Sequence, residues 1–326
     1  MIDQWSLCDV SFQSDADFQP NSRDMTLGPS TLLWLFRRLG LLCAAAACAV
    51  AAQPPTLHIL WKTVSSDGRY AMAWTTRASE DDLPAPADHD QNPVSNYVVE
   101  TASGNVIMQI PDGHYWETDH QPNHYDFEAA WSPDYTHLIA VYNGRWSFDL
   151  VVIADLKQVR VWNVGDKLAA DFRRHLRATA GPAYLKSQGK LAISFSSPWF
   201  VAPDRFCVTA DAEVPKSAED REFQNLLYFG LRNSGDKLVS EKAEKVPGDQ
   251  DFAGSFLLVD RELNRTYQTL RALLPAQERQ KLVAEQRAWL RQRDAIRDAG
   301  RQVTFVSDRQ QELEARLENV IAEKNR

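Results

Sequence analysis

A segment of 15 residues in the first half of the chain carries the side chains best suited to bind a metal ion. It runs from residue 112 to residue 126 and contains three histidines and four carboxylates. Imidazole suits zinc, and carboxylates suit harder divalent cations. The candidate ligands are His114, His120, His124 and Asp119. The spacing of the histidines matches no metal-binding motif, and loops between strands are rich in such residues, so we favour a solvated loop over a metal site.

The rest of the sequence offers no catalytic constellation. It contains no glycine-rich phosphate loop, no nucleophile elbow and no supported pair of catalytic carboxylates. The formal net charge is −8, and the absence of a basic patch argues against a nucleic-acid partner. We therefore predict a protein that is not an enzyme and needs no cofactor. A metal-dependent hydrolase is a third hypothesis, behind two binding functions.

The elements that would position this loop are strands. Residues 53–248 contain short runs rich in Val, Ile, Trp, Tyr and Phe, separated by Asp-Gly, Ser-Gly, Asn-Gly and Pro-Asp turn signals. This pattern predicts an all-β domain over residues 53–248. The strongest predicted hairpins join 97–100 to 106–108, 149–153 to 159–162, and 226–229 to 238–239.

One helix is predicted to interrupt the strands, from about residue 167 to residue 179. Leu168, Phe172, His175 and Leu176 mark one of its faces, and Pro182 follows its end. On such a face His175 is expected to be a packing residue.

A turn signal recurs three times in the β-rich segment. It reads Ser66-Asp67-Gly68, then Ser132-Pro133-Asp134, then Ala202-Pro203-Asp204, and each copy leads into an apolar run. The motif resembles the strand starts of TolB-type β-propellers. Closed propellers have about four to eight blades. Three units therefore predict either an incomplete, propeller-like stack of antiparallel sheets or a β-sandwich.

Residues 249–326 change to helical periodicity. Apolar residues recur at steps of three, four and seven between 252 and 273, and Pro275 separates them from a second run that opens at Ala276. Gly300 is the expected stop of the second helix, and Ser307 or Asp308 the expected cap of a third. Three amphipathic helices with short connections predict a small antiparallel bundle.

Arginine provides most of the positive charge on these helices. From residue 251 onward there are 12 Arg and 2 Lys against 12 acidic residues. Arg293 lies four residues after Trp289, a spacing that places the guanidinium over the indole. Arg287 and Asp294 are expected to face Asp260 and Glu262 of the first helix. We interpret these charges as interhelical pairs; the alternative is that some of the arginines enter a partner's acidic cleft.

Two short motifs on these helices carry a family resemblance. The first comprises Asp260, Leu263, Asn264 and Tyr267, and the second comprises Gln286, Arg287, Trp289, Arg293 and Asp294. Together they resemble the LprI-like lysozyme inhibitors of the bacterial envelope. The resemblance implies that these nine positions are structural or partner-binding, and that the partner is a lysozyme or another cell-wall hydrolase.

The chain departs from that family in its cysteines. Members usually carry cysteines that flank these helices, including one soon after the Arg-Asp pair, where this chain has Ile296. No cysteine follows Cys207, which lies in an apolar run and is expected to be a small buried hydrophobe. The bundle is therefore expected to rely on its core or on docking to the preceding domain.

The amino-terminal 52 residues predict export. Residues 39–52 are uncharged, follow Arg37-Arg38 and end in a small-x-small pattern at residues 49–51. We expect a cleavable signal that starts at Met25, preceded by an upstream extension, and a periplasmic or extracellular protein. Cys48 as a lipid-attachment site is a less favoured alternative. Contact with a membrane is expected only through this segment or such an anchor.

Two functional hypotheses follow. In the first, the helical region is a lysozyme inhibitor that acts by protein–protein interaction. In the second, the protein is a non-inhibitory scaffold of the cell envelope. The motif residues favour the first, and the missing cysteines favour the second.

Overall fold

The computed structural model describes residues 56–76, 94–117, 126–145, 147–180, 182, 184, 191–213, 222–232, 237–246 and 252–325. The export signal, Asp119, His120 and His124 lie outside the described residues. Residues Pro55–Arg326 form one compact unit.

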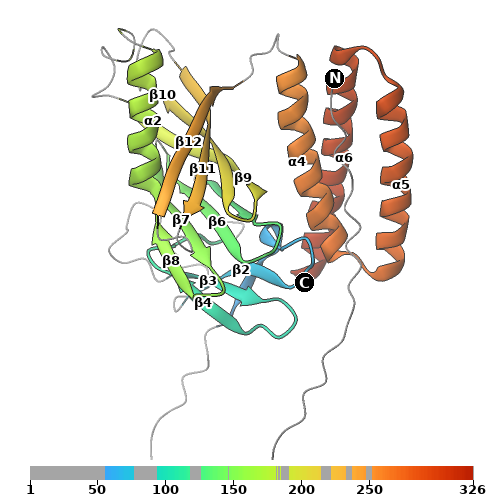
Figure 1. The fold of residues 1–326 in the computed structure, drawn as a ribbon. Helices are drawn as coiled ribbons and strands as arrows, with labels where there is room; N and C mark the ends of the chain where they lie inside the picture. The colour runs from blue at the N-terminus through green and yellow to red at the C-terminus, as the bar shows by residue number, and fades with distance from the viewer. Residues whose placement is uncertain are drawn as a thin grey trace, which may run out of the picture. The chain divides into compact units, whose positions relative to one another are not determined.

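The β-rich segment folds into three antiparallel sheets of four strands (Figure 1). The first sheet contains β1 (His58–Leu60), β2 (Tyr70–Thr75), β3 (Ser95–Glu100) and β4 (Val106–Ile110), with the short 3-10 helix η1 (Trp61–Thr63) after β1. The second contains β5 (Asp126–Trp131), β6 (His137–Asn143), β7 (Phe148–Asp155) and β8 (Arg160–Asn163). The third contains β9 (Ala192–Ala202), β10 (Arg205–Glu213), β11 (Glu222–Arg232) and β12 (Lys237–Lys245).

In each sheet, strands that are consecutive in sequence are neighbours in space. The pairs β3–β4, β7–β8 and β11–β12 are the three predicted hairpins, and all three are confirmed. The predicted class, a β-rich domain of stacked antiparallel sheets followed by a helical region, is also confirmed.

The recurring turn signal joins the first strand of each sheet to the second. In the first sheet the hydroxyl of Ser65 donates to Asp67 (2.6 Å) and accepts from the backbone N–H of Tyr70 (3.0 Å). In the second sheet Ser132 makes the same two bonds, to Asp134 (2.8 Å) and from the N–H of His137 (2.9 Å). In these two turns a serine and the aspartate two residues after it close the turn. In the first sheet this serine is Ser65, one residue before the motif, and the third copy has Ala202 at the same position, so only the aspartate recurs in all three.

Helix α2 (Gly165–Thr179) covers the second and third sheets. Leu168, Phe172 and Leu176 are fully buried in a core that includes Ile153 of β7 and Phe206 of β10. The predicted helix and its apolar face are therefore confirmed. His175, which was also predicted on that face, is partly buried. Its Nε2 lies 3.1 Å from Asn225 Nδ2. Burial lowers the pKa of His175.

Cys207 is buried in β10, as predicted for a small hydrophobe. Burial raises the pKa of its thiol. The thiol is therefore protonated at neutral pH, which makes it a poor nucleophile and a poor metal ligand.

The carboxyl-terminal region forms three consecutive antiparallel helices, as predicted: α4 (Phe252–Leu273), α5 (Ala276–Ala295) and α6 (Ala299–Lys324). The predicted start of the third helix is wrong. Asp298 caps α6, its carboxylate accepting from the N–H of Arg301 (2.8 Å), and Gly300 lies in the first turn of α6 rather than ending α5. Ser307 and Asp308 lie inside α6 and cap nothing.

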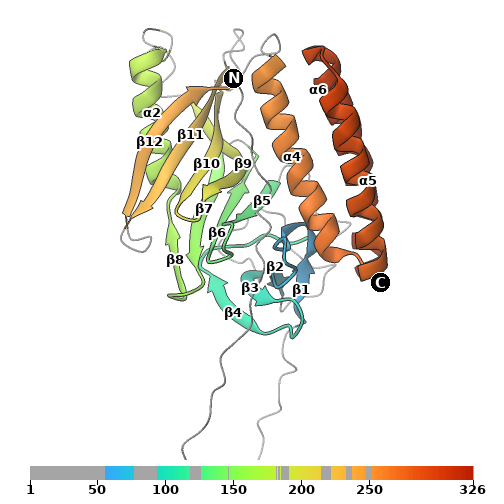
Figure 2. The ribbon, with the colours of Figure 1, turned by 45° about the vertical axis from the view of Figure 1, so that its right-hand side comes forward.

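The three helices share one core with the first sheet. Leu263, Leu282 and Leu313, one from each helix, belong to the same buried cluster as Val64 and Ala73. Helix α4 lies between the sheets and the other two helices (Figure 2). The bundle is thus held by its core and by docking, without a disulfide among the described residues. Within the described part of the chain, no helix has the length and apolar character needed to cross a membrane.

Candidate functional site

The residues of the first motif lie along one face of α4 but differ in burial. Leu263 and Tyr267 are buried in the core shared with the first sheet. Asn264 is exposed, and its amide donates to the backbone carbonyl (2.8 Å) and the carboxylate (3.2 Å) of Asp260, one helical turn earlier. The apolar motif positions are therefore structural, and the polar pair lies at the surface of α4.

The second motif is divided in the same way on α5. Gln286 and Trp289 are buried, and the Trp289 ring stacks on Phe305 of α6, with ring centroids 5.4 Å apart and planes parallel to within 1°. The oxygen of Gln286 accepts from the buried guanidinium of Arg309 at 3.2 Å. Arg287, by contrast, is exposed.

The polar motif positions meet between α4 and α5. The Arg293 guanidinium lies 5.6 Å from the Trp289 ring centroid, as the four-residue spacing predicts, and donates to Asp260 at 3.0 Å. It also pairs with Asp294 at 2.9 Å. Burial raises the pKa of Asp260 although Arg293 acts in the opposite direction.

The predicted partners of Asp260 and Glu262 are therefore wrong. Arg293 rather than Arg287 bonds Asp260, because the helix turns Arg287 to solvent. Glu262 pairs with Arg265 of its own helix at 2.6 Å. The interhelical-pair interpretation holds for Arg293 and not for Arg287.

Helix α4 is fixed to the sheets by charged and aromatic side chains. Arg265 donates to Glu128 of β5 at 2.7 Å, and the same carboxylate accepts from the backbone N–H of Ser197, at 3.1 Å to one oxygen and 3.2 Å to the other. Ser197 has a φ of 44°, a left-handed conformation that non-glycine residues seldom adopt. Arg261 stacks on Trp199 of β9, with the guanidinium carbon 4.0 Å from the ring centroid.

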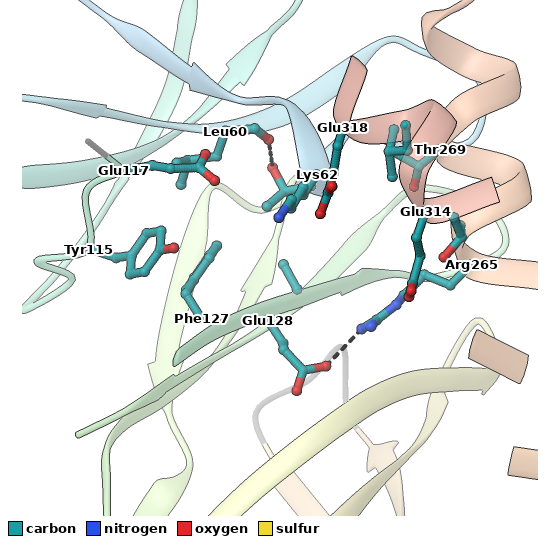
Figure 3. Close-up of a pocket in the computed structure, with 14 residues that line it drawn as sticks. Leu60, Lys62, Tyr115, Glu117, Phe127, Glu128, Arg265, Thr269, Glu314 and Glu318 are labelled. Carbon is teal, nitrogen blue, oxygen red and sulfur yellow. Dashed lines mark hydrogen bonds and ion pairs between the residues drawn. The ribbon is translucent and has the colours of Figure 1, made fainter. Parts of the chain in front are cut away.

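A cavity of about 330 Å³ lies beside this docking contact. Figure 3 shows Arg265 reaching from α4 to Glu128, with Glu314 of α6 drawn beside Arg265 and Glu318 of α6 drawn near Lys62. Glu117, which follows β4 outside any strand, completes the acidic set, whereas Lys62 and Arg265 are the cations of the lining. The lining is mixed polar and apolar, and it contains the Arg265–Glu128 ion pair that joins α4 to β5.

The metal hypothesis can be tested only at His114 among its four candidates. The Nδ1 of His114 is bonded to the carbonyl of Val94 at 2.7 Å, as expected for a loop histidine that bonds backbone. Within the residues that the structure describes, no three His, Cys, Asp or Glu side chains are placed to hold a metal ion.

Sequence reasoning missed the residues that dock α4. Arg265 and Glu128 are 137 positions apart, and Arg261 and Trp199 pair across two elements without any shared motif. The one local signal was the Glu262–Arg265 spacing, which is typical of helical ion pairs.

Comparison with known proteins gave three results. No curated protein matches the chain. A solved structure assigned to TolB from Agrobacterium tumefaciens aligns with a TM-score of 0.24 and 11% identity, over 60% of this chain and 52% of that one. The chain thus spans about half the length of that structure. Residues 247–321 match the sequence profile of the family described as Lysozyme inhibitor LprI. The helical region, helices α4 to α6, is therefore similar to the lysozyme inhibitor LprI family, as its two motifs predicted.

Proposed function

We propose that the protein is a binding protein whose helical region inhibits a lysozyme or a related cell-wall hydrolase by protein–protein contact. The observation that carries the proposal is the family match over residues 247–321. The intact arrangement of the motif residues supports it, because Arg293 links Asp260 to Trp289 as a single unit.

The structure limits where such a partner would bind. Helix α4 is covered by the sheets on one side and by α6 on the other. Helix α5 keeps an exposed face that includes Arg287 and Arg291, one turn apart. Within the described residues neither arginine has an ion-pair partner, and like charges at this spacing destabilise a helix. An arginine pair of this kind suits a partner that presents carboxylates, since each guanidinium can form two parallel hydrogen bonds with a carboxylate.

The first prediction tests this face in the full-length mature protein. The double variant Arg287→Ala/Arg291→Ala should weaken inhibition of lysozyme-driven clearing of a bacterial cell-wall suspension roughly ten- to hundredfold. That range assumes about 0.7–1.4 kcal/mol for each interfacial arginine, since every 1.4 kcal/mol changes the affinity tenfold. The readout is the inhibitor concentration that halves the clearing rate.

The matched control is Arg173→Ala/Arg177→Ala on α2, which removes two exposed arginines at the same spacing. It should leave inhibition unchanged. Equal losses in the two double variants would assign the effect to net charge, which also fades with salt because exposed charges are screened beyond about 8 Å at physiological ionic strength. Failure of the folded wild-type protein to inhibit any lysozyme class would reject the inhibitor proposal.

A scaffold function is the second candidate, and one observation favours it. The helices are held by a core shared with the first sheet and by the Arg265–Glu128 contact, in place of the family's disulfides. In that function the helices complete the β fold and present α5 to a partner that is not a hydrolase.

We also propose that the protein is exported to the periplasm or beyond the cell. The second prediction is that the exported form begins near Ala52 or Gln53, after cleavage of the signal that starts at Met25. Mass spectrometry of the secreted or periplasmic pool measures this terminus. Recovery of residues 1–50 in the mature soluble pool would contradict the proposal.

A further inference from the structure

The cavity of about 330 Å³ beside the docking contact of α4 has an excess of negative charge in its lining. Among the described residues, four carboxylates line it against two cations, which leaves a formal charge of −2. The carboxylates belong to Glu117, Glu128, Glu314 and Glu318, and the cations to Lys62 and Arg265.

Arg265 does not neutralise the rest of this lining, because two carboxylates already share it. Its guanidinium pairs with Glu128 at 2.7 Å and with Glu262 of the same helix at 2.6 Å. Burial raises the pKa of Glu262, and the charges of Glu128 and Glu314 raise it further, although Arg265 opposes them. Negative charge therefore remains uncompensated on this side of α4.

Four polar side chains of the lining have no partner within the described part of the chain. Glu117 and Glu318 form no hydrogen bond or ion pair there. Thr266 and Thr269 of α4 are each 6% exposed, yet neither hydroxyl bonds the carbonyl one turn earlier, the usual partner of a buried helical threonine. Neither threonine oxygen is closed off from solvent, so both hydroxyls open onto the space that these residues line. Unbonded hydroxyls on side chains that are otherwise buried indicate a place for a ligand.

The carboxylates are spread over the cavity rather than gathered at one point. In Figure 3, Glu117 lies on the side of Tyr115 and Phe127, and Glu314 lies on the opposite side. No three His, Cys, Asp or Glu side chains of the described residues are placed to hold one metal ion. Apolar side chains, Leu60 and Phe127 among them, form other parts of the lining. An extended ligand with a positive charge at each end fits this distribution better than a single compact cation.

A linear aliphatic diamine has the complementary chemistry. Each ammonium group has three N–H donors, which suit carboxylates and hydroxyl oxygens. Its two positive charges offset the formal charge of the lining, and its methylene chain can pack on apolar side chains while both charged ends stay bonded. A basic amino acid adds a carboxylate, which the acidic lining repels.

We propose that this cavity binds a linear aliphatic diamine. One ammonium group bonds Glu117, and the other bonds the carboxylates of α6 and the threonine hydroxyls of α4. The methylene chain lies against Leu60 and Phe127. The proposal goes beyond the proposed inhibition and does not depend on it, because no described residue of α5 lines the cavity.

The third prediction compares cadaverine with two molecules of similar length. The full-length mature protein is titrated with each of them by calorimetry at physiological ionic strength. Cadaverine should bind saturably, with one molecule per chain. Pentylamine lacks one ammonium group, and lysine adds a carboxylate, so each should bind at least about tenfold more weakly, the loss expected for one hydrogen-bonded charge.

Four variants test the assigned groups. Glu117→Gln and Glu318→Gln each remove one carboxylate at the same size and should weaken cadaverine binding about fivefold, the upper range for a partly exposed ion pair. The double variant Thr266→Val/Thr269→Val removes both hydroxyls at the same size and should weaken binding by a similar factor. Lys62→Met removes a repelling charge and should strengthen binding about two- to fivefold.

The matched control is Glu213→Gln, which removes an exposed carboxylate of β10 outside the cavity lining. It should bind cadaverine like the wild type. Equal losses in this control and in the cavity variants would assign binding to the net charge of the chain and overturn the proposal. The proposal also fails if the folded wild type shows no saturable binding, if pentylamine or lysine binds as tightly as cadaverine, or if Lys62→Met weakens binding. Thermal unfolding checks that each variant is folded, and the four variants keep the test decisive if one of them is not.

Discussion

Replacement of Trp289 by alanine is expected to lower the free energy of unfolding by about 3–5 kcal/mol, the usual range for deleting a large buried aromatic side chain. Only 8% of Trp289 is exposed, and its ring stacks on Phe305 and lies under the Arg293 guanidinium. The substitution removes both contacts and leaves a cavity in the core that the helices share with the first sheet. Urea denaturation of the full-length mature protein, followed by circular dichroism, measures the change.

Two further variants serve as comparisons for Trp289→Ala. Trp289→Phe retains a ring for the stack and should cost less than the alanine variant. Ala284→Ser, at an exposed position of the same helix, should change the free energy of unfolding by less than about 0.5 kcal/mol. A loss below about 1 kcal/mol for Trp289→Ala would place the ring at the surface, where it becomes a candidate anchor for the partner.

Replacement of Phe172 by alanine is expected to have an effect of similar size, about 3–5 kcal/mol. Phe172 is 0% exposed and projects from α2 into the core between the second and third sheets. The substitution removes the packing of α2 against the sheets. The same urea denaturation should therefore show a lower midpoint concentration of urea.

The control for Phe172 is the next residue on the same helix. Arg173→Ala lies on the exposed face of α2, keeps a good helix former, and should change the free energy of unfolding by less than about 0.5 kcal/mol. If the two variants were equally stable, α2 would not be packed on the sheets, and the core assigned here would be incorrect.

Much of the fold could be predicted because it depends on local sequence patterns. The hairpin at residues 97–108 follows from alternating apolar residues around Gly104, whose φ of 70° suits the turn. The face of α2 follows from helical periodicity. The start of α6 could not be predicted in this way, because two local signals compete. Gly300 often ends a helix, but Asp298 caps the next one two residues earlier, and glycine is tolerated in a first turn.

The candidate site was predictable only within single helices. The Arg293–Trp289 contact depends on a four-residue spacing that the sequence contains, and it forms as expected. The partner of Asp260 depends on how α5 is rotated against α4, which periodicity alone does not fix. The Arg265–Glu128 contact joins residues 137 positions apart, for which a single sequence holds no signal.

The core shared by the helices and the first sheet also determines the order in which the chain can complete its fold. The ribosome makes β1 to β4 first, but the apolar side chains of Val64, Ala71 and Val99 are covered by residues as late as Leu317 and Ile321. The first sheet therefore carries a partly uncovered apolar face until the last helix is in place, and transiently exposed apolar surface of this kind favours aggregation. A premature stop within α6 would leave that face open permanently, and such a product is expected to aggregate rather than to persist as a β domain.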